Sequence, residues 1–147
     1  MITWEIKKFD ELSVHELYSI LRLRSEVFVV EQNCVFQDAD DKDQQCFHLM
    51  GWEEDKLLAY ARIVPPEVIY KEPSIGRIVT SPASRRKGLG RQLMTESMKQ
   101  TERLYSKIPI RIGAQQYLIP FYQSFGFVIS GDPYMEDGIP HIEMIMS

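Results

Sequence analysis

The sequence predicts a single α/β domain over residues 1–147, in which a mixed, mostly antiparallel sheet is flanked by helices. Segments with strand-like and helix-like patterns alternate along the whole chain. Two strand-like segments, residues 47–52 and 56–64, are separated by three acidic residues, which predicts an antiparallel hairpin. The 147 residues suffice for one sizeable core, and no repeat, low-complexity tract or linker divides them.

The first third of the chain predicts a strand, a helix and a loop. Residues 4–8 alternate as a short strand does. Residues 13–16 form a capping box, with Ser13 as N-cap and Glu16 three positions later. Helical spacing follows, so this helix is expected to pass through residue 24 toward residue 30, and the polar residues 37–45 predict a loop. The apolar positions that define the helix are Val14, Leu17, Tyr18 and Leu21.

The rest of the chain contains a strand–helix–strand unit. The apolar run 75–80 predicts a strand, the pattern from residue 89 to residue 104 predicts a long amphipathic helix, and residues 108–114 predict another strand. Such a unit is expected to make a right-handed crossover and to leave its two strands paired in parallel. The remaining predicted elements are a short helix over 118–125 and closing strands at 127–130 and 142–146.

A basic, glycine-rich segment links the strand 75–80 to the long helix. It reads Arg85-Arg86-Lys87-Gly88-Leu89-Gly90 and is followed by Arg91. A strand, a glycine loop and a helix start in this order form an anion-binding geometry, because free backbone N–H groups and the helix dipole point toward the ligand. The spacing matches neither the P-loop nor the G-x-G-x-x-G dinucleotide motif. The alternative is a helix start whose basic side chains are merely solvated.

Composition and charge exclude several classes. The net charge of −4 argues against general nucleic-acid binding, while the local basic cluster suits a small anionic ligand. No apolar run is long enough to span a membrane, and the N-terminus lacks a signal-peptide pattern, so a cytoplasmic location is expected.

Cys34 and Cys46 are expected to be reduced. No metal site is expected, because the aspartates of 38–43 and the Cys–His spacings fit neither calcium nor zinc patterns, and a solvated acidic loop is predicted.

Two motifs of this sequence, in the same order along the chain, resemble motifs of the GNAT N-acetyltransferases. The pattern R-x-x-G-x-G between a strand and a long helix resembles the acyl-CoA pyrophosphate loop of that family. The later segment 121–127, Phe-Tyr-Gln-Ser-Phe-Gly-Phe, resembles the family's Y-x-x-x-G-F motif. Residues 24–32, the acidic run 38–43 and residues 136–142 resemble the ElaA-type branch, so the resemblance covers nearly the whole chain.

The resemblance implies the GNAT acyl-CoA N-acyltransferase fold, with acetyl-CoA as co-substrate. Backbone amides of residues 85–90 would bind the pyrophosphate, and the basic side chains would add positive charge. The pantetheine arm would lie along the fourth strand, and Phe121 and Tyr122 would belong to the same site. The full implied set is Ile78, Val79, Thr80, Arg85, Arg86, Lys87, Gly88, Leu89, Gly90, Arg91, Phe121 and Tyr122.

The resemblance also implies catalytic roles for individual residues. Tyr122 is the candidate general acid that protonates the departing thiolate, although a core tyrosine would have the same spacing. A strand glutamate that serves as base in some family members has no counterpart in Gly76-Arg77-Ile78. The resemblance implies that the N-terminal segment lines the acceptor site, so Glu31 is the leading candidate base, with His48 and His141 as alternatives.

The expected reaction is direct transfer of an acetyl group to the amine of a small molecule or protein. Glu31 and the acidic run mildly favour a cationic amine. The alternative is a non-catalytic module that binds acyl-CoA or a partner, and a different nucleotide-binding protein is a third possibility. No nucleic-acid or membrane partner is expected, and a homodimer is left open.

Overall fold

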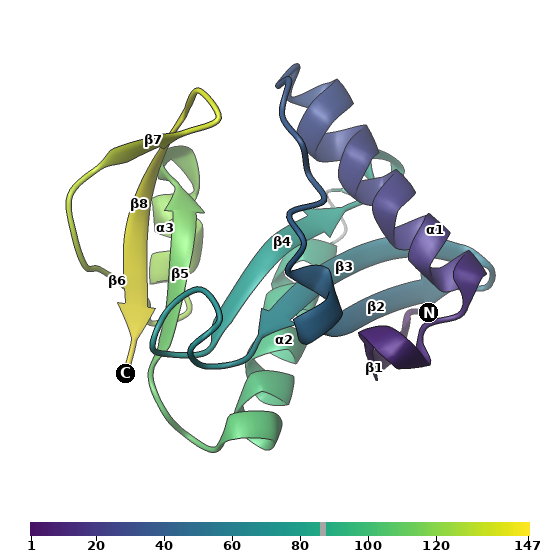
Figure 1. Cartoon of the computed structure of the whole chain (residues 1–147), viewed down its shortest axis with the longest axis horizontal. Coiled ribbons are helices and arrows are strands. Elements are labelled where there is room, and N and C mark those ends of the chain that lie inside the picture. Colours follow the sequence, from purple (N-terminus) through teal and green to yellow (C-terminus); the bar gives the residue numbers. More distant parts are fainter. Residues whose placement is uncertain (86–87) are drawn as a thin grey trace.

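Two sheets diverge from a shared lower end to form the framework of the molecule (Figure 1). A computed structural model describes residues 1–85 and 88–147. The first sheet has the order β1-β2-β3-β4; in the second, β8 lies between β5 and β6 and also pairs with β7, and every ladder is antiparallel. The strands are β1 (Thr3–Lys8), β2 (Phe47–Glu53), β3 (Lys56–Val64), β4 (Ser74–Thr80), β5 (Ile110–Gln115), β6 (Val128–Ile129), β7 (Tyr134–Glu136) and β8 (Ile139–Met146).

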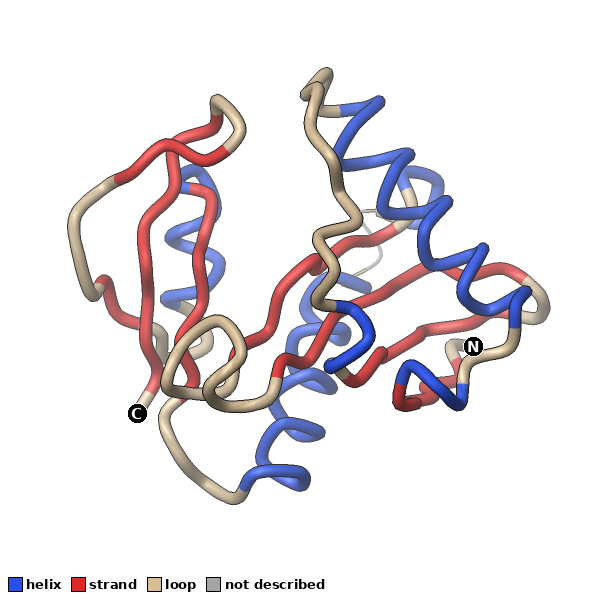
Figure 2. Tube along the Cα trace, in the orientation of Figure 1, coloured by secondary structure: helices blue, strands red, loops and turns tan. Residues whose placement is uncertain are grey.

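Helices cover both faces of this framework. The α-helices of the described residues are α1 (Val14–Arg24), α2 (Leu89–Tyr105) and α3 (Ile119–Gln123). Figure 2 shows α1 in front of the first sheet and α2 behind it, while α3 lies behind the second sheet. The Ser13 hydroxyl accepts a hydrogen bond from the Glu16 backbone N–H at 3.1 Å, so the predicted capping box is confirmed. Beyond Arg24 the chain continues helically, but residues 25–31 form π-helical turns.

The alternation of side chains along the first sheet divides the core into two parts. Leu49, Ala61 and Ile63 join the larger cluster, which includes α2 and the inner face of the second sheet. Met50 and Tyr60 point the opposite way and pack with residues of α1. Successive strand residues point to opposite faces, so both sides of this sheet are buried.

The predicted parallel pair between β4 and β5 is wrong. The two strands run side by side, but their described residues form no ladder; near their starts the Arg111 N–H donates to the Pro73 carbonyl at 3.1 Å. Beyond that point the strands separate, so β4 presents a free edge to the space between the sheets. An open strand edge exposes unpaired N–H and C=O groups, which a ligand can satisfy.

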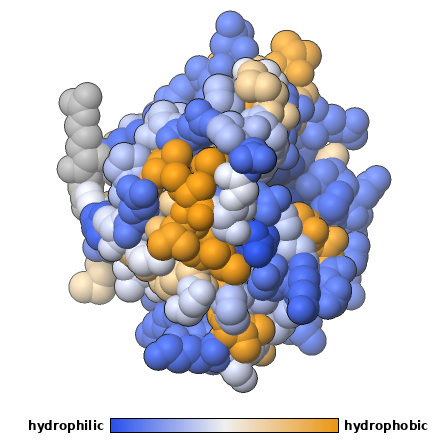
Figure 3. All heavy atoms as spheres, turned by 90° about the vertical axis from the view of Figure 1, so that its left-hand side faces the viewer, coloured by the Kyte–Doolittle hydropathy of each residue, from blue (hydrophilic) through white to orange (hydrophobic). Residues whose placement is uncertain are grey.

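The second sheet has an exposed apolar surface. Figure 3 shows this side of the molecule, where an orange hydrophobic area lies among blue hydrophilic residues. The exposed large apolar side chains of this sheet are those of Val128, Ile129 and Met135. Among the helices described, none is long and apolar enough to cross a membrane.

Candidate active site

The divergence of β4 from β5 creates a cleft of about 850 Å³. Residues of β4 line one wall, and β5, β7 and β8 contribute to the other. The chain that follows the π-helical turns comes close to the second sheet, since the Cys34 thiol donates to the Asp137 carbonyl at 3.0 Å. The cleft is therefore built by segments that are far apart in the sequence.

A bulge distorts β4 where it faces the cleft. The register with β3 shifts between Tyr60 and Arg62, and Arg77 adopts a left-handed backbone conformation with φ of 49°. Such a conformation costs a non-glycine residue roughly 1–3 kcal/mol and is concentrated at functional sites. A bulge also redirects the neighbouring peptide groups. The three predicted pantetheine-binding residues, Ile78, Val79 and Thr80, follow the bulge and line the cleft.

The glycine loop leads into α2 as the sequence predicts. Gly88 has φ of 72°, a left-handed conformation that glycine adopts without strain, and it immediately precedes α2. A Cβ added to Gly90 would meet no atom within 4 Å, so packing does not require glycine there. The side chain of Leu89 is buried in the core, which leaves its backbone for any ligand. The predicted phosphate-binding residues Arg86 and Lys87 lie outside the described residues.

The two described arginines of the predicted phosphate site already have protein partners. Arg85 forms two contacts with the Glu31 carboxylate, at 2.7 and 2.8 Å. Arg91 donates to the Ser124 hydroxyl at 3.0 Å and stacks its guanidinium 4.5 Å from the Phe125 ring centre. These contacts orient both side chains at the start of α2.

The predicted general acid, Tyr122, lies on α3 and reaches the cleft. It is only 6% exposed, and its ring packs edge-on against Phe121 and Phe127. Burial raises the pKa of its phenol, so the group keeps its proton at neutral pH, as a general acid must. Phe121 packs beside Tyr122 and near Arg91 and is not among the residues that line the cleft.

The three candidate bases occupy different environments. The hydrogen bond from Arg85 lowers the pKa of Glu31, which makes this carboxylate a weaker base. His48 is fully buried away from the cleft, where its ring contacts the Tyr60 hydroxyl at 2.7 Å and the Asp43 carbonyl at 2.9 Å. His141 lines the cleft from the start of β8.

The surroundings of His141 indicate which ring nitrogen carries the proton of the neutral ring. Its Nδ1 lies 2.7 Å from the Ile139 carbonyl, which can only accept, so we assign the proton of the neutral ring to Nδ1. Nε2 is then unprotonated and lies 3.6 Å from a carboxylate oxygen of Glu136. The Tyr134 ring stacks on the imidazole with a centroid separation of 5.7 Å. His141 is consequently better placed than Glu31 to accept a proton in the cleft.

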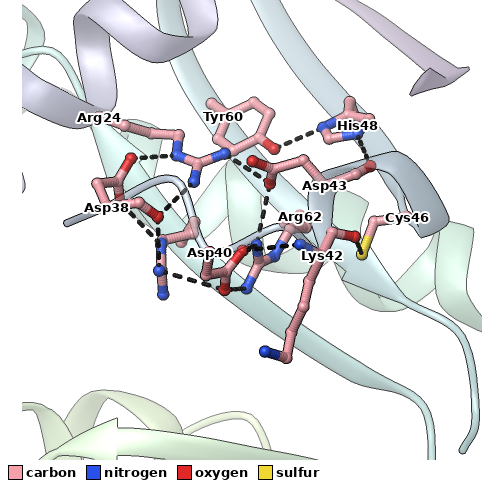
Figure 4. A network of polar contacts seen from close by, with 10 residues as sticks. Arg24, Asp38, Asp40, Lys42, Asp43, Cys46, His48, Tyr60 and Arg62 are labelled. Carbon is pink, nitrogen blue, oxygen red and sulfur yellow. Dashed lines mark hydrogen bonds and ion pairs between the residues drawn. The ribbon is translucent and has the colours of Figure 1, made fainter. Parts of the chain in front are cut away.

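The predicted solvated loop over residues 38–43 is wrong, because three of its four aspartates pair with arginines inside the fold and only Asp41 is exposed (Figure 4). Arg24 is fully buried; its Nε donates to Asp38 at 2.7 Å and its Nη1 to Asp43 at 2.8 Å. Arg62 contacts Asp40 and Asp43 at 2.8 and 2.9 Å. Arg77 completes the network by donating to Asp38 at 2.8 Å and to Asp40 at 3.4 Å.

This ion network holds the loop against α1, β3 and β4 at the edge of the cleft. Sequence reasoning missed its arginines, although two of them left signals. Arg24 lies on the apolar face of α1 with Ile20 and Leu23, and Arg62 interrupts a buried strand. A charged residue at such a position requires a buried partner. No cluster of metal-binding side chains occurs among the residues that the structure describes.

Comparisons with known proteins agree with this architecture. The model of the acetyltransferase (GNAT) domain family matches residues 14–147. Protein ElaA of Escherichia coli is 44% identical over 146 residues, covering 98% of this chain and 95% of that protein. A UPF0039 protein of Synechocystis is also 44% identical, over 98% of this chain and 94% of its own length.

Solved structures extend the similarity to the whole chain. The crystal structure of an acyl-CoA N-acyltransferase from Pseudomonas aeruginosa is 42% identical, with a TM-score of 0.96 and full coverage of both chains. That of E. coli ElaA is 43% identical, with a TM-score of 0.93 and the same coverage. An aminoglycoside 6′-N-acetyltransferase complexed with coenzyme A shares the fold at 15% identity, with a TM-score of 0.71 over 96% of this chain and 95% of its own. The chain therefore belongs to the GNAT acetyltransferase family, in the branch that contains ElaA.

Proposed function

We propose that this protein transfers an acetyl group from acetyl-CoA to an amine bound in the cleft between β4 and β5. The observation that carries the proposal is the free, bulged edge of β4, which runs along the cleft from Ser74 to Thr80, toward the glycine start of α2. A distant neighbour of the same fold has been crystallised with coenzyme A. The extended donor would use the edge of β4 for its amide groups and the helix start for its phosphates.

The side chains around this edge suit direct transfer. The amine nitrogen attacks the thioester carbonyl, so that a carbon–nitrogen bond forms and the carbon–sulfur bond breaks. His141 Nε2 would take the proton that the ammonium group must lose, and Tyr122 would give its phenolic proton to the departing thiolate. Because Glu31 is neutralised by Arg85, we assign it to orienting the phosphate-side arginine rather than to proton transfer.

Gly90→Ala tests the donor site without weakening the fold. The added methyl group meets no protein atom within 4 Å, and alanine favours a helix over glycine by about 1 kcal/mol. The thermal stability should therefore stay constant or rise. A CoA pyrophosphate at the helix start would meet the methyl group, so calorimetry should show weaker binding of CoA to the variant.

Two outcomes would count against the proposed function, the first against the donor site and the second against acetyl transfer. CoA affinity that is equal in wild type and Gly90→Ala would place the phosphates elsewhere. Tight CoA binding by wild type without thiol release from acetyl-CoA across a broad panel of amines would instead indicate the non-catalytic acyl-CoA-binding module.

A further inference from the structure

The Lys42 side chain projects from a rigid backbone into the cleft. The Lys42 N–H donates to Asp40 at 3.1 Å, and its carbonyl accepts from the Gln45 N–H and the Cys46 thiol, both at 3.1 Å. Figure 4 shows its amino group directed away from the ion network, and Lys42 lines the cleft. The network therefore fixes the point from which this ammonium group extends.

Lys42 differs from the arginines of the cleft in its charge balance. Arg85 is neutralised by Glu31. Arg62 and Arg77, together with Arg24, face an equal number of aspartates: Asp38, Asp40 and Asp43. Among the described residues, Lys42 has no carboxylate within ion-pair distance, so it is the uncompensated positive charge of the cleft lining.

Negative charge gathers at a different part of the lining. Glu136 ends β7 and Asp137 begins the turn into β8, and both line the cleft beside His141. Nε2 of His141 is the nearest basic group to Glu136, at 3.6 Å. The backbone carbonyl of Asp137 accepts a hydrogen bond from the Cys34 thiol, whereas its side-chain carboxylate forms no ion pair among the described residues. The candidate proton acceptor thus lies at the negative part of the cleft.

We propose that the acceptor is zwitterionic: a carboxylate on it binds Lys42, while its amine lies beside His141 and Glu136. This inference rests on the proposed acetyl transfer and narrows its acceptor to amino acids or short peptides with a free C-terminus. It also replaces the sequence-based argument for a simple cationic amine, because arginines neutralise Glu31 and three of the four aspartates, and the fourth, Asp41, is exposed and does not line the cleft. Lys42 acts here as a specificity residue.

Matched acceptor pairs test the carboxylate directly. Each pair contains a dipeptide, such as glycyl-phenylalanine, and its C-terminal amide, because the distant amide changes the amine pKa little. Thiol release from acetyl-CoA gives kcat/KM for both members with wild type, Lys42→Met and Lys42→Arg. Lys56→Met is the control, since Lys56 is exposed in the β2–β3 hairpin and does not line the cleft.

For the dipeptide with the highest kcat/KM, wild type should prefer the acid over the amide by about tenfold, as expected for a charge-assisted contact in a partly buried site. In Lys42→Met this ratio should approach one, chiefly through KM, while CoA affinity stays unchanged. Lys42→Arg should restore part of the preference, and Lys56→Met should keep all of it.

Equal kcat/KM for acid and amide with wild type, or an undiminished preference in Lys42→Met, would overturn the zwitterionic acceptor while leaving acetyl transfer intact. If no amine releases thiol, the proposed reaction fails. In that case calorimetry with CoA present decides the inference: tighter binding of the acid that is lost in Lys42→Met supports the subsite, and equal binding of acid and amide overturns it.

Discussion

Asp43→Asn removes the carboxylate that joins two buried arginines of the ion network. Asp43 Oδ1 accepts from Arg24 Nη1 at 2.8 Å and from Arg62 Nη1 at 2.9 Å, and both arginines are at most 2% exposed. Removal of one member of a buried ion pair costs about 3–5 kcal/mol, because the other charge is left unpaired. We expect a loss of about 4 kcal/mol in the free energy of unfolding.

This loss converts into a large change in melting temperature. An unfolding entropy of about 2.1 cal/mol/K per residue gives roughly 0.3 kcal/mol/K for 147 residues. A loss of about 4 kcal/mol therefore lowers the Tm by about 13 °C, which calorimetry or circular dichroism at pH 7 measures easily.

Asp41→Asn is the matched control from the same loop. Asp41 is exposed and has φ of 63°, a conformation that asparagine tolerates well. Its Tm should stay close to that of wild type. A Tm for Asp43→Asn within 2–3 °C of the Asp41→Asn value, about 1 kcal/mol on the same scale, would refute the assigned importance of the network.

The same variant has a predicted pH dependence. Burial alone would raise the pKa of Asp43, but hydrogen bonds and charge from Arg24 and Arg62 outweigh it and lower the pKa. The stabilisation is then complete above the ordinary carboxyl pKa, about 4, and is lost as the pH falls through the lowered value. The Tm difference between wild type and Asp43→Asn should accordingly shrink in acid, and a difference that grows in acid would contradict the assigned direction.

Two further predictions concern the cleft. Tyr122→Phe should lower kcat by about 10²–10⁴-fold without changing CoA affinity, since it removes the donated proton and keeps the ring; unchanged turnover would remove Tyr122 from the mechanism. Gly113→Ala should reduce the free energy of unfolding by about 1–3 kcal/mol, because its Cβ would lie 2.7 Å from the Tyr134 hydroxyl oxygen and 3.0 Å from that of Tyr70. Gly76→Ala is the control and should not destabilise the fold, because its Cβ would meet no atom within 4 Å. An equal free energy of unfolding in the two variants would show that the two tyrosine hydroxyls move aside at no cost.

The sequence predicted most elements of the fold because their signals are local. The capping box at Ser13 located the start of α1, and the three-residue turn identified the β2–β3 hairpin. β7 was missed because three residues are too few to show a period. The splay of β4 from β5 was also missed, since strand pairing in a sheet is decided by tertiary contacts rather than by either strand alone.

The sequence likewise predicted the parts of the candidate site that have local signals. The glycine loop and Tyr122 belong to short motifs, and the structure places Tyr122 and the β4 residues at one cleft. The ion network escaped prediction because its partners are 14–39 residues apart in the chain. The distribution of charge along the cleft depends on which carboxylates those arginines neutralise. It could therefore be determined only from the structure, which shows the partners.

Acetyl transfer itself is tested most directly by following one reaction with two readouts. Wild-type protein, acetyl-CoA and a dipeptide with a free C-terminus are mixed, and thiol release is compared with the amount of N-acetylated dipeptide measured by mass spectrometry. We predict equal molar amounts of both products and a strong reduction of both in Tyr122→Phe. Thiol release without an acetylated amine, or no release with any amine despite bound CoA, would contradict transfer to an amine in this cleft.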